Sequence, residues 1–225
     1  MTQPAAVLPH LALNDASQRI AGAARLARRE ADEVTLVAIT KTHPAERIEP
    51  LIAAGQRVFG ENRVQEAEAK WPALRDAHGG LELHLVGRLQ SNKAREAVEL
   101  FDAVHSLDRL SLVAALARAM DKADRRVPCF IQVNIGEEPQ KGGCPITELP
   151  VLLSAAREAA IPLAGLMGIP PEKVEPAPFF AFLAKLADDH GIAGLSMGMS
   201  GDFETAVMLG ATHVRLGSAL FGARE

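Results

Sequence analysis

The chain has 225 residues, 48% of them apolar, and a formal net charge of −4. Its acidic balance, its 4% aromatic content and its lack of tyrosine argue against nucleic-acid binding, which needs basic patches and stacking rings. No apolar run approaches the ~20 residues of a membrane span. Residues 1–9 lack the charged and apolar regions of a signal peptide, so we expect a cytoplasmic protein.

Strand-like and helix-like segments alternate along almost the whole chain. An amphipathic segment at residues 11–30 comes first; it either packs over the bottom of the domain or forms a partner surface, and packing is favoured. The short, branched, apolar runs that follow are residues 35–40, 57–59, 82–86, 103–105, 129–134, 163–167, 194–196 and 213–216. The helix-like stretches between them are residues 45–54, 63–75, 92–100, 109–123, 147–159, 178–190 and 201–209, and a short segment, 218–221, comes last.

This regular alternation predicts parallel strands joined by right-handed crossovers. Eight such units suit an α/β fold: a single (β/α)8 TIM barrel with an extra N-terminal helix, forming one domain over residues 1–225. An open doubly wound sheet is the main alternative. Against it, the first strand–helix turn lacks GxGxxG, and eight strands exceed the usual five or six.

Lys41 follows the first predicted strand directly. In a barrel of this kind, functional residues gather just after the C-terminal ends of the strands. A lysine amine there can condense with an aldehyde to form a Schiff base. The alternative interpretation of Lys41 alone is a solvated loop lysine.

Two serine–glycine pairs follow the last two predicted strands. We expect Ser200-Gly201 and Gly217-Ser218 each to open a helix, where backbone N–H groups can bind an anion. Loops after strands seven and eight are a recurrent phosphate site on this fold, although either serine could be an ordinary N-cap.

The predicted phosphate loops and Lys41 become neighbours when the barrel closes. This combination suggests pyridoxal 5′-phosphate (PLP), held covalently on Lys41 as a Schiff base. Arg215 could then face the ring nitrogen and keep it unprotonated, or it could form a salt bridge at the barrel mouth.

The two cysteines form no disulfide framework and, without a CxxC or a histidine cluster, no metal site is predicted. Cys129 lies in a strand-like run and is expected in the core. Cys144 lies in a glycine-rich loop and is expected to be exposed.

Five motifs in order resemble the YggS/PROSC family of pyridoxal phosphate-binding proteins, also called pyridoxal phosphate homeostasis proteins. They are residues 38–44 (AITKTHP), 59–66 (FGENRVQE), 84–93 (HLVGRLQSNK), 195–200 (LSMGMS) and 214–222 (VRLGSALFG). The resemblance covers nearly the whole chain and implies a barrel of the alanine racemase type, without that enzyme's second β domain.

The same resemblance assigns roles to residues of this chain. Lys41 matches the cofactor lysine and Arg215 the arginine at the ring nitrogen. The other matches are the phosphate contacts Ser200, Gly217 and Ser218 and the pocket-lining positions Asn62, His84 and Met167. The sequence departs from the family pattern at Thr40 and Ser218, which keep a hydroxyl, and at Gly201, where a polar residue is common.

Cofactor binding alone does not make a racemase, which needs a second acid/base on the opposite face of the ring. Alanine racemases use a tyrosine for this, and this chain has none, although Cys144 or His84 could stand in. We therefore expect a monomeric, non-catalytic PLP carrier or buffer that acts in vitamin B6 homeostasis, with PLP-dependent apo-enzymes as recipients.

Three alternatives remain open at this point. The first is a PLP-dependent amino-acid racemase or lyase of the alanine racemase type. The second is a sugar-phosphate enzyme that uses Lys41 as a Schiff base to its substrate. The third concerns Lys93, Arg88 and Lys141, which form either a second cofactor-holding region or solvated charge, and solvated charge is favoured.

Overall fold

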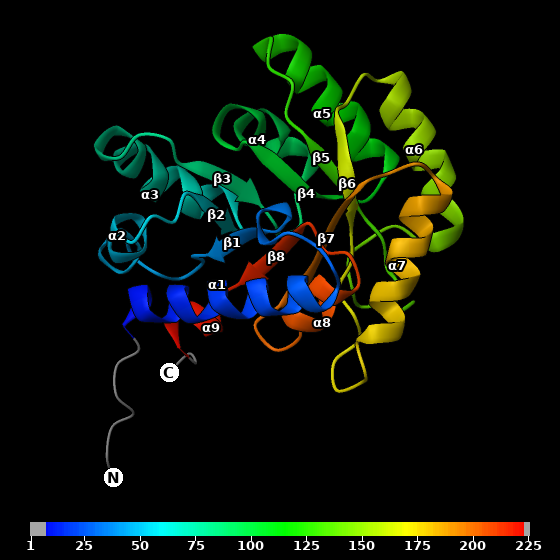
Figure 1. Ribbon diagram of the computed structural model, residues 1–225. Helices are drawn as coiled ribbons and strands as arrows, with labels where there is room; N and C mark the ends of the chain where they lie inside the picture. The colour runs from blue at the N-terminus through cyan, green and yellow to red at the C-terminus, as the bar shows by residue number, and fades with distance from the viewer. Residues whose placement is uncertain (1–7, 223–225) are drawn as a thin grey trace.

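The computed structural model describes residues 8–222, in which parallel strands close into a barrel surrounded by helices (Figure 1). The strands are β1 (Thr35–Ile39), β2 (Val58–Glu61), β3 (Glu82–Leu85), β4 (Ala103–Leu107), β5 (Cys129–Gln132), β6 (Leu163–Met167), β7 (Gly194–Met199) and β8 (His213–Leu216). The helices are α1 (Pro9–Leu26), α2 (Ala45–Ala53), α3 (Val64–Ala77), α4 (Ala94–Leu100), α5 (Leu110–Ala123), α6 (Leu149–Glu158), α7 (Ala177–Asp189), α8 (Phe203–Met208) and α9 (Ser218–Phe221). Short 3-10 helices are η1 (Ala31–Glu33), η2 (Ser91–Lys93) and η3 (Ile146–Glu148).

The predicted (β/α)8 barrel with an extra N-terminal helix is confirmed. Each strand pairs in parallel with the next, and β8 closes the ring on β1, for example through Leu36 and Val214. This closure excludes the open doubly wound sheet, because an open sheet leaves two strand edges unpaired.

Several predicted boundaries shift at the C-terminal ends of the strands, where the loops of the barrel mouth begin. β2 runs on to Glu61 and β7 to Met199, three residues beyond Ser196 at its predicted end. The pairing of β7 with β8 shifts register between Ser196 and Met199, and Gly198 has a φ of 91°, which favours glycine. β5 instead ends early, at Gln132, and the next residue, Val133, forms an isolated parallel bridge with Cys144.

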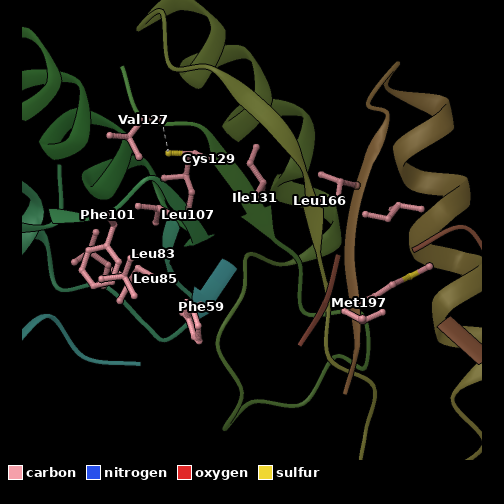
Figure 2. Close-up of a cluster of buried hydrophobic side chains, with 14 of the residues drawn as sticks. Phe59, Leu83, Leu85, Phe101, Leu107, Val127, Cys129, Ile131, Leu166 and Met197 are labelled. Carbon is pink, nitrogen blue, oxygen red and sulfur yellow. Dashed lines mark hydrogen bonds between the residues drawn. The ribbon is translucent and has the colours of Figure 1, made fainter. Parts of the chain in front are cut away.

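The hydrophobic core lies on both sides of the barrel wall. Alternation along β2 directs Phe59 outward, where its ring packs 5.1 Å from the ring of Trp71 on α3. Gly60 faces inward, because a Cβ atom there would meet the side chains of Val37 and Ile39. Figure 2 shows how buried residues from several strands, with Leu83 and Ile131 among them, form one continuous apolar cluster.

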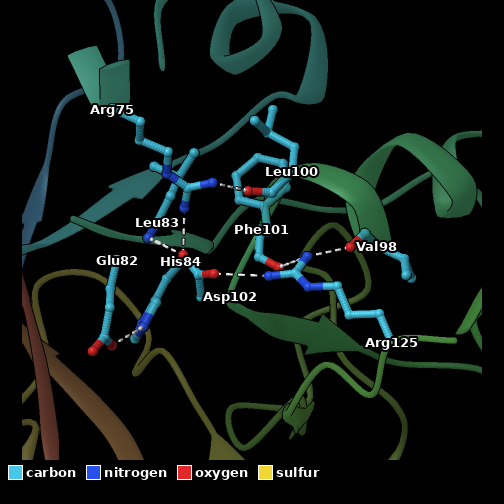
Figure 3. A network of polar contacts seen from close by, with 9 residues as sticks. All are labelled: Arg75, Glu82, Leu83, His84, Val98, Leu100, Phe101, Asp102 and Arg125. Atoms are coloured by element: carbon cyan, nitrogen blue, oxygen red, sulfur yellow. Dashed lines mark hydrogen bonds and ion pairs between the residues drawn. The ribbon is translucent and has the colours of Figure 1, made fainter. Parts of the chain in front are cut away.

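An arginine–aspartate network ties together the N-terminal end of the barrel. Asp102, just before β4, accepts hydrogen bonds from Arg75 of α3 and Arg125 of the α5–β5 loop (Figure 3). The same carboxylate accepts the backbone N–H of Leu83 on β3 at 2.8 Å. Helix α3, strand β3, the α5–β5 loop and the residue before β4 are therefore joined at the end of the barrel opposite its mouth.

Helix α1 packs onto the outer helical layer. It contacts α8, α9 and α2, and in Figure 1 it runs along that side of the barrel. Arg19 forms a bidentate pair with Glu204 of α8, and its guanidinium lies 4.6 Å from the ring centroid of Phe203. The favoured packing role is confirmed, but the helix covers the side of the barrel rather than its bottom.

Candidate functional site

A cavity of about 380 Å³ opens where the C-terminal ends of the strands meet. We call it the mouth cavity. Its lining residues are Ile39, Lys41, Asn62, Val86, Ile169, Met199, Ser200, Gly201, Arg215, Gly217 and Ser218. The fold thus brings together six of the predicted site residues from loops far apart in sequence.

The other two predicted site residues, His84 and Met167, are not among the residues that line this cavity. Both are buried, with 5% and 1% of their surface exposed. His84 lies in the second half of β3 and contacts other histidine rings inside the barrel.

Lys41 sits in a strained turn directly after β1. The next residue, Thr42, has a φ of 66°, a left-handed conformation that is unfavourable for a β-branched residue. The backbone N–H of Thr42 donates to Glu66 Oε1 at 2.5 Å, and the N–H of His43 donates to the carbonyl of Thr40 at 3.1 Å. The turn is therefore held on both sides of its strained residue.

A second lysine, Lys70 of α3, fixes this turn from behind. Its Nζ donates to the carbonyls of Thr40 and His43 at 3.0 and 2.9 Å. The same ammonium lies 2.6 Å from the carboxylate of Glu61, which is fully buried at the end of β2. We call the pair Glu61–Lys70 the turn clamp.

Within the described residues, only one of the two carboxylate oxygens of Glu61 has hydrogen-bond partners. Glu61 Oε1 accepts from the Thr40 hydroxyl at 2.6 Å and from the Trp71 indole N–H at 3.1 Å, whereas Oε2 is buried without a hydrogen-bond partner. A buried charge in this state depends on its single cation. The clamp was not predicted from the sequence, although Glu61 close to a predicted strand end was a usable signal.

The predicted phosphate loops differ from expectation at Ser200. The expectation that Ser200-Gly201 opens a helix is wrong, because α8 begins at Phe203 and Asp202 is the residue before it. The longer β7 places Ser200 in the turn, where Asp202 Oδ1 accepts the N–H of Met199 at 2.6 Å.

Ser200 instead faces the start of α9. Its hydroxyl oxygen accepts the backbone N–H of Gly217 at 3.2 Å and of Ala219 at 3.0 Å. The two loops therefore do meet, and they converge on one cluster of N–H groups rather than two. The Ser200 oxygen accepts both of these N–H groups, and its own O–H is left to donate to an anionic oxygen.

Arg215 projects from β8 into the cavity and is held by neutral groups. Its Nη1 donates to Ser196 Oγ at 2.6 Å and its Nη2 to the carbonyl of Gly168 at 3.2 Å. Among residues 8–222 no carboxylate pairs with it, so the alternative of a salt bridge at the barrel mouth is wrong. Burial lowers the pKa of Arg215 to about 10, against the opposing charge of Asp202, so the group stays charged at neutral pH.

Cys144 is buried, so the expected exposure is wrong. Its N–H donates to the carbonyl of Gln132 at 2.8 Å, and its carbonyl accepts the N–H of Asn134 at 2.9 Å. These bonds fold the loop back along β5. Burial, with the charges of Asp108 and Glu148, raises the pKa of the Cys144 thiol to about 12. Cys129 is buried as expected.

The remaining basic residues near the mouth are distributed over two places. Arg88 and Lys93 border a second cavity of about 470 Å³, which shares Asn62 with the mouth cavity. Lys93 pairs with Glu96 at 3.0 Å. Lys141 is not at this cavity; its Nζ lies 2.6 Å from Glu138 and donates to the Pro170 carbonyl at 2.9 Å. The three cations do not form one site.

Within residues 8–222, no group of three or more His, Cys, Asp or Glu side chains is placed to hold a metal ion. In the same residues, no helix has the length and apolarity needed to cross a membrane.

Comparison with known proteins finds a matching family, similar sequences and similar solved structures. Residues 16–225 match the model of the alanine racemase N-terminal domain. A pyridoxal phosphate homeostasis protein of Pseudomonas aeruginosa is 41% identical over 92% of each chain. The structure of PipY from Synechococcus elongatus PCC7942 with PLP bound is 41% identical, has a TM-score of 0.76, and is covered over 92% of this chain and 99% of that one.

A more distant match shows the fold alone. Alanine racemase of Clostridium difficile 630 has a TM-score of 0.73 at 14% identity, and the match covers 96% of this chain and 57% of the enzyme. Fold and cavity together define a barrel protein of the alanine racemase type. Within that class, the chain belongs to the pyridoxal phosphate homeostasis protein family.

Proposed function

We propose that this protein binds PLP in the mouth cavity as a Schiff base on Lys41 and serves intracellular PLP homeostasis as a non-catalytic carrier. The observation that carries the proposal is the convergence of an amine, a guanidinium and two serine hydroxyls in one cavity of about 380 Å³. That volume suits a ligand of this size. The PLP-bound PipY, 41% identical, supports the same ligand.

Each group has a part in binding. Lys41 supplies the amine, and Ser200, Gly217 and Ser218 line the phosphate end of the cavity. The Ser200 oxygen accepts the N–H of Gly217, so its own O–H is left to donate to the phosphate, with the Ser218 hydroxyl beside it. Arg215 faces the ring nitrogen, with Asn62 beside the ring. When bound, PLP supplies an aldehyde and a ring that acts as an electron sink, and a cation at the ring nitrogen weakens that sink.

The racemase alternative needs a second acid/base at the cavity. The chain has no tyrosine, and neither Cys144 nor His84 is among the lining residues. A thiol with a pKa of about 12 is also a poor source of a thiolate at neutral pH. These observations support the carrier over the racemase or lyase.

The domain organisation, oligomeric state, location and partners of the protein are proposed as well. We infer one PLP-binding domain over residues 1–225, a monomer in the cytoplasm, and PLP-dependent apo-enzymes as recipients of the cofactor. The relatives named as pyridoxal phosphate homeostasis proteins support the homeostasis role.

The Schiff base is tested with purified protein and added PLP. We expect a visible absorption band, fixed by borohydride reduction and located on Lys41 by peptide mass spectrometry. Lys41→Ala should lose the band, whereas Lys93→Ala, a matched variant of another mouth lysine, should keep it. A colourless wild-type protein after PLP addition would refute the proposal.

The carrier role is tested separately. The PLP-loaded protein is incubated with single amino-acid enantiomers, and the products are separated by chiral chromatography. We expect no turnover above that of free PLP. Turnover well above that level, lost in Lys41→Ala, would establish the racemase or lyase instead.

A further inference from the structure

Three histidine rings lie together inside the barrel, beneath the mouth cavity. His84 of β3, His105 of β4 and His213 of β8 have ring centroids 5.0 to 6.1 Å apart. Phe130 stacks on His105 at 4.2 Å. The proposed function gives these rings no role.

Burial keeps the three imidazoles neutral. It lowers the pKa of His84 to about 3 and that of His213 to about 4, and it holds the pKa of His105 well below its usual value. Neighbouring rings and the Arg215 cation act in the same direction on these pKa values. A neutral imidazole has one donor and one acceptor nitrogen, so its tautomer decides what it can bind.

Two of these histidines belong to a hydrogen-bonded chain that ends at the cavity. Arg215 Nη1 donates to Ser196 Oγ at 2.6 Å. Ser196 Oγ lies 2.8 Å from His105 Nδ1, and His105 Nε2 lies 3.1 Å from His84 Nδ1. We call Arg215–Ser196–His105–His84 the imidazole chain.

The Arg215 cation at one end of the imidazole chain determines which atom donates in each hydrogen bond of the chain. A guanidinium only donates, so Ser196 Oγ accepts from Arg215 and is left with its own O–H to donate. In residues 8–222 the acceptor within reach of that hydroxyl is His105 Nδ1. His105 then carries its proton on Nε2 and donates it to His84 Nδ1.

The last member of the chain follows from the same logic. His84 accepts on Nδ1, so its proton is on Nε2, which faces Glu82 Oε2 at 3.7 Å (Figure 3). The opposite direction would leave the Ser196 hydroxyl, which is fully buried, without an acceptor, and a buried unmade hydrogen bond is costly.

We propose that Ser196 and His105 are positioning residues that lock the Arg215 guanidinium in the orientation needed at the cofactor's ring nitrogen. The proposal rests on the proposed function. Arg215 has a long side chain, and Ser196 with the Gly168 carbonyl holds both of its terminal nitrogens. His105 and His84 complete this arrangement. His105 Nδ1 is the acceptor for the Ser196 hydroxyl, and His84 Nδ1 accepts from His105 Nε2 and so keeps His105 in that tautomer.

The first test reads the tautomers directly and needs no cofactor. Long-range ¹⁵N–¹H NMR of the labelled protein near neutral pH should show His105 and His84 neutral, each with its proton on Nε2. A proton on Nδ1 of either ring, or an imidazolium, would overturn the inferred direction of the chain.

The second test measures PLP affinity by absorbance titration. We expect Ser196→Ala to bind about tenfold more weakly than wild type, a change of about 1.4 kcal/mol, because a hydrogen bond to a charged group is lost. Ser196→Thr keeps the hydroxyl and should stay within about twofold. His105→Phe, which keeps a ring beside Phe130, should also weaken binding.

His213→Phe is the matched control. His213 contacts the same rings, but its Nδ1 lies 2.9 Å from Thr212 Oγ1 and it is outside the imidazole chain. Its affinity for PLP should equal that of wild type. Wild-type affinity in folded Ser196→Ala, or an equal loss in His213→Phe, would overturn the positioning role; if Ser196→Ala does not fold, His105→Phe decides. No PLP binding by wild type would instead refute the proposed function, and the tautomer result would still stand.

Discussion

At the turn that carries Lys41, a strained residue and a buried charge occur together. Thr42 has a φ of 66°, and such a conformation costs on the order of 1–3 kcal/mol. It persists because Glu66 accepts its N–H and Lys70 donates to the carbonyls on both sides. The surrounding residues therefore fix the backbone position from which the Lys41 side chain extends.

Replacing Lys70 should show how strongly the buried Glu61 carboxylate depends on its cation. Lys70→Met leaves the Glu61 carboxylate buried without its cation, and we expect a loss of about 3–5 kcal/mol in the free energy of unfolding. Chemical denaturation measures it. A loss below about 1 kcal/mol would contradict the clamp.

The control for this prediction removes both charges. Glu61→Gln with Lys70→Met should recover most of the stability, because no unpaired buried charge is left. Its Lys41 turn would still lack the two carbonyl contacts from Lys70, so the Schiff base with PLP should form more slowly than in wild type. Stopped-flow absorbance separates these two effects.

At the scale of elements, strand order could be predicted from the sequence, whereas the local geometry of strand ends could not. Lys41 and Arg215 were placed at the mouth correctly because each lies at a strand end, and parallel strands all end on one side. Ser200 was misplaced as a helix opener because β7 continues to Met199. The register shift that extends it depends on pairing with β8, which no local pattern contains.

The direction of side chains inside the barrel could not be predicted from the sequence either. His84 was predicted at the pocket through a motif, yet it lies beside His105 and His213 in the interior. His84 and His105 lie on the neighbouring strands β3 and β4, whereas His213 on β8 reaches them only because the barrel closes. The burial of Cys144 likewise follows from long-range backbone bonds to the region of β5 rather than from its glycine-rich loop.

Close contact between two mouth loops gives a prediction at this scale. A Cβ atom at Gly87, after β3, would lie 2.2 Å from the backbone oxygen of Asn62, after β2. Gly87→Ala should push the two loops apart, cost ~1–3 kcal/mol of stability and weaken PLP binding through Asn62. Denaturation and titration measure the two effects.

Gly22→Ala is the matched control for this substitution. Gly22 lies within α1, and a Cβ there would meet nothing within 4 Å. Alanine should therefore stabilise the helix by roughly 0.5–1 kcal/mol and leave PLP binding unchanged. If Gly87→Ala behaved like Gly22→Ala, the contact between the loops would not be tight.

For the whole molecule, the buried histidines link stability to pH. His84 and His213 have pKa values near 3 and 4 when folded, against about 6.5 in an unfolded chain. Below pH ~6.5 the unfolded state therefore binds more protons than the folded state, and stability falls as pH falls. The contribution is fully present above the unfolded pKa and is lost progressively toward the folded values.

We therefore expect the free energy of unfolding to drop by about 1.4 kcal/mol per pH unit for each of His84, His213 and His105, whose pKa burial also holds well below its usual value, once the unfolded residue is charged. The window from pH ~6 to ~4.5 isolates them, because unperturbed carboxylates titrate near 4. Denaturant unfolding at a series of pH values gives the slope. His213→Phe should lower it by one histidine's share, since a phenylalanine cannot be protonated in either state. A free energy of unfolding that stays level from pH 6.5 to 4.5 would mean that the cluster accepts protons without unfolding, contrary to the burial that keeps these rings neutral.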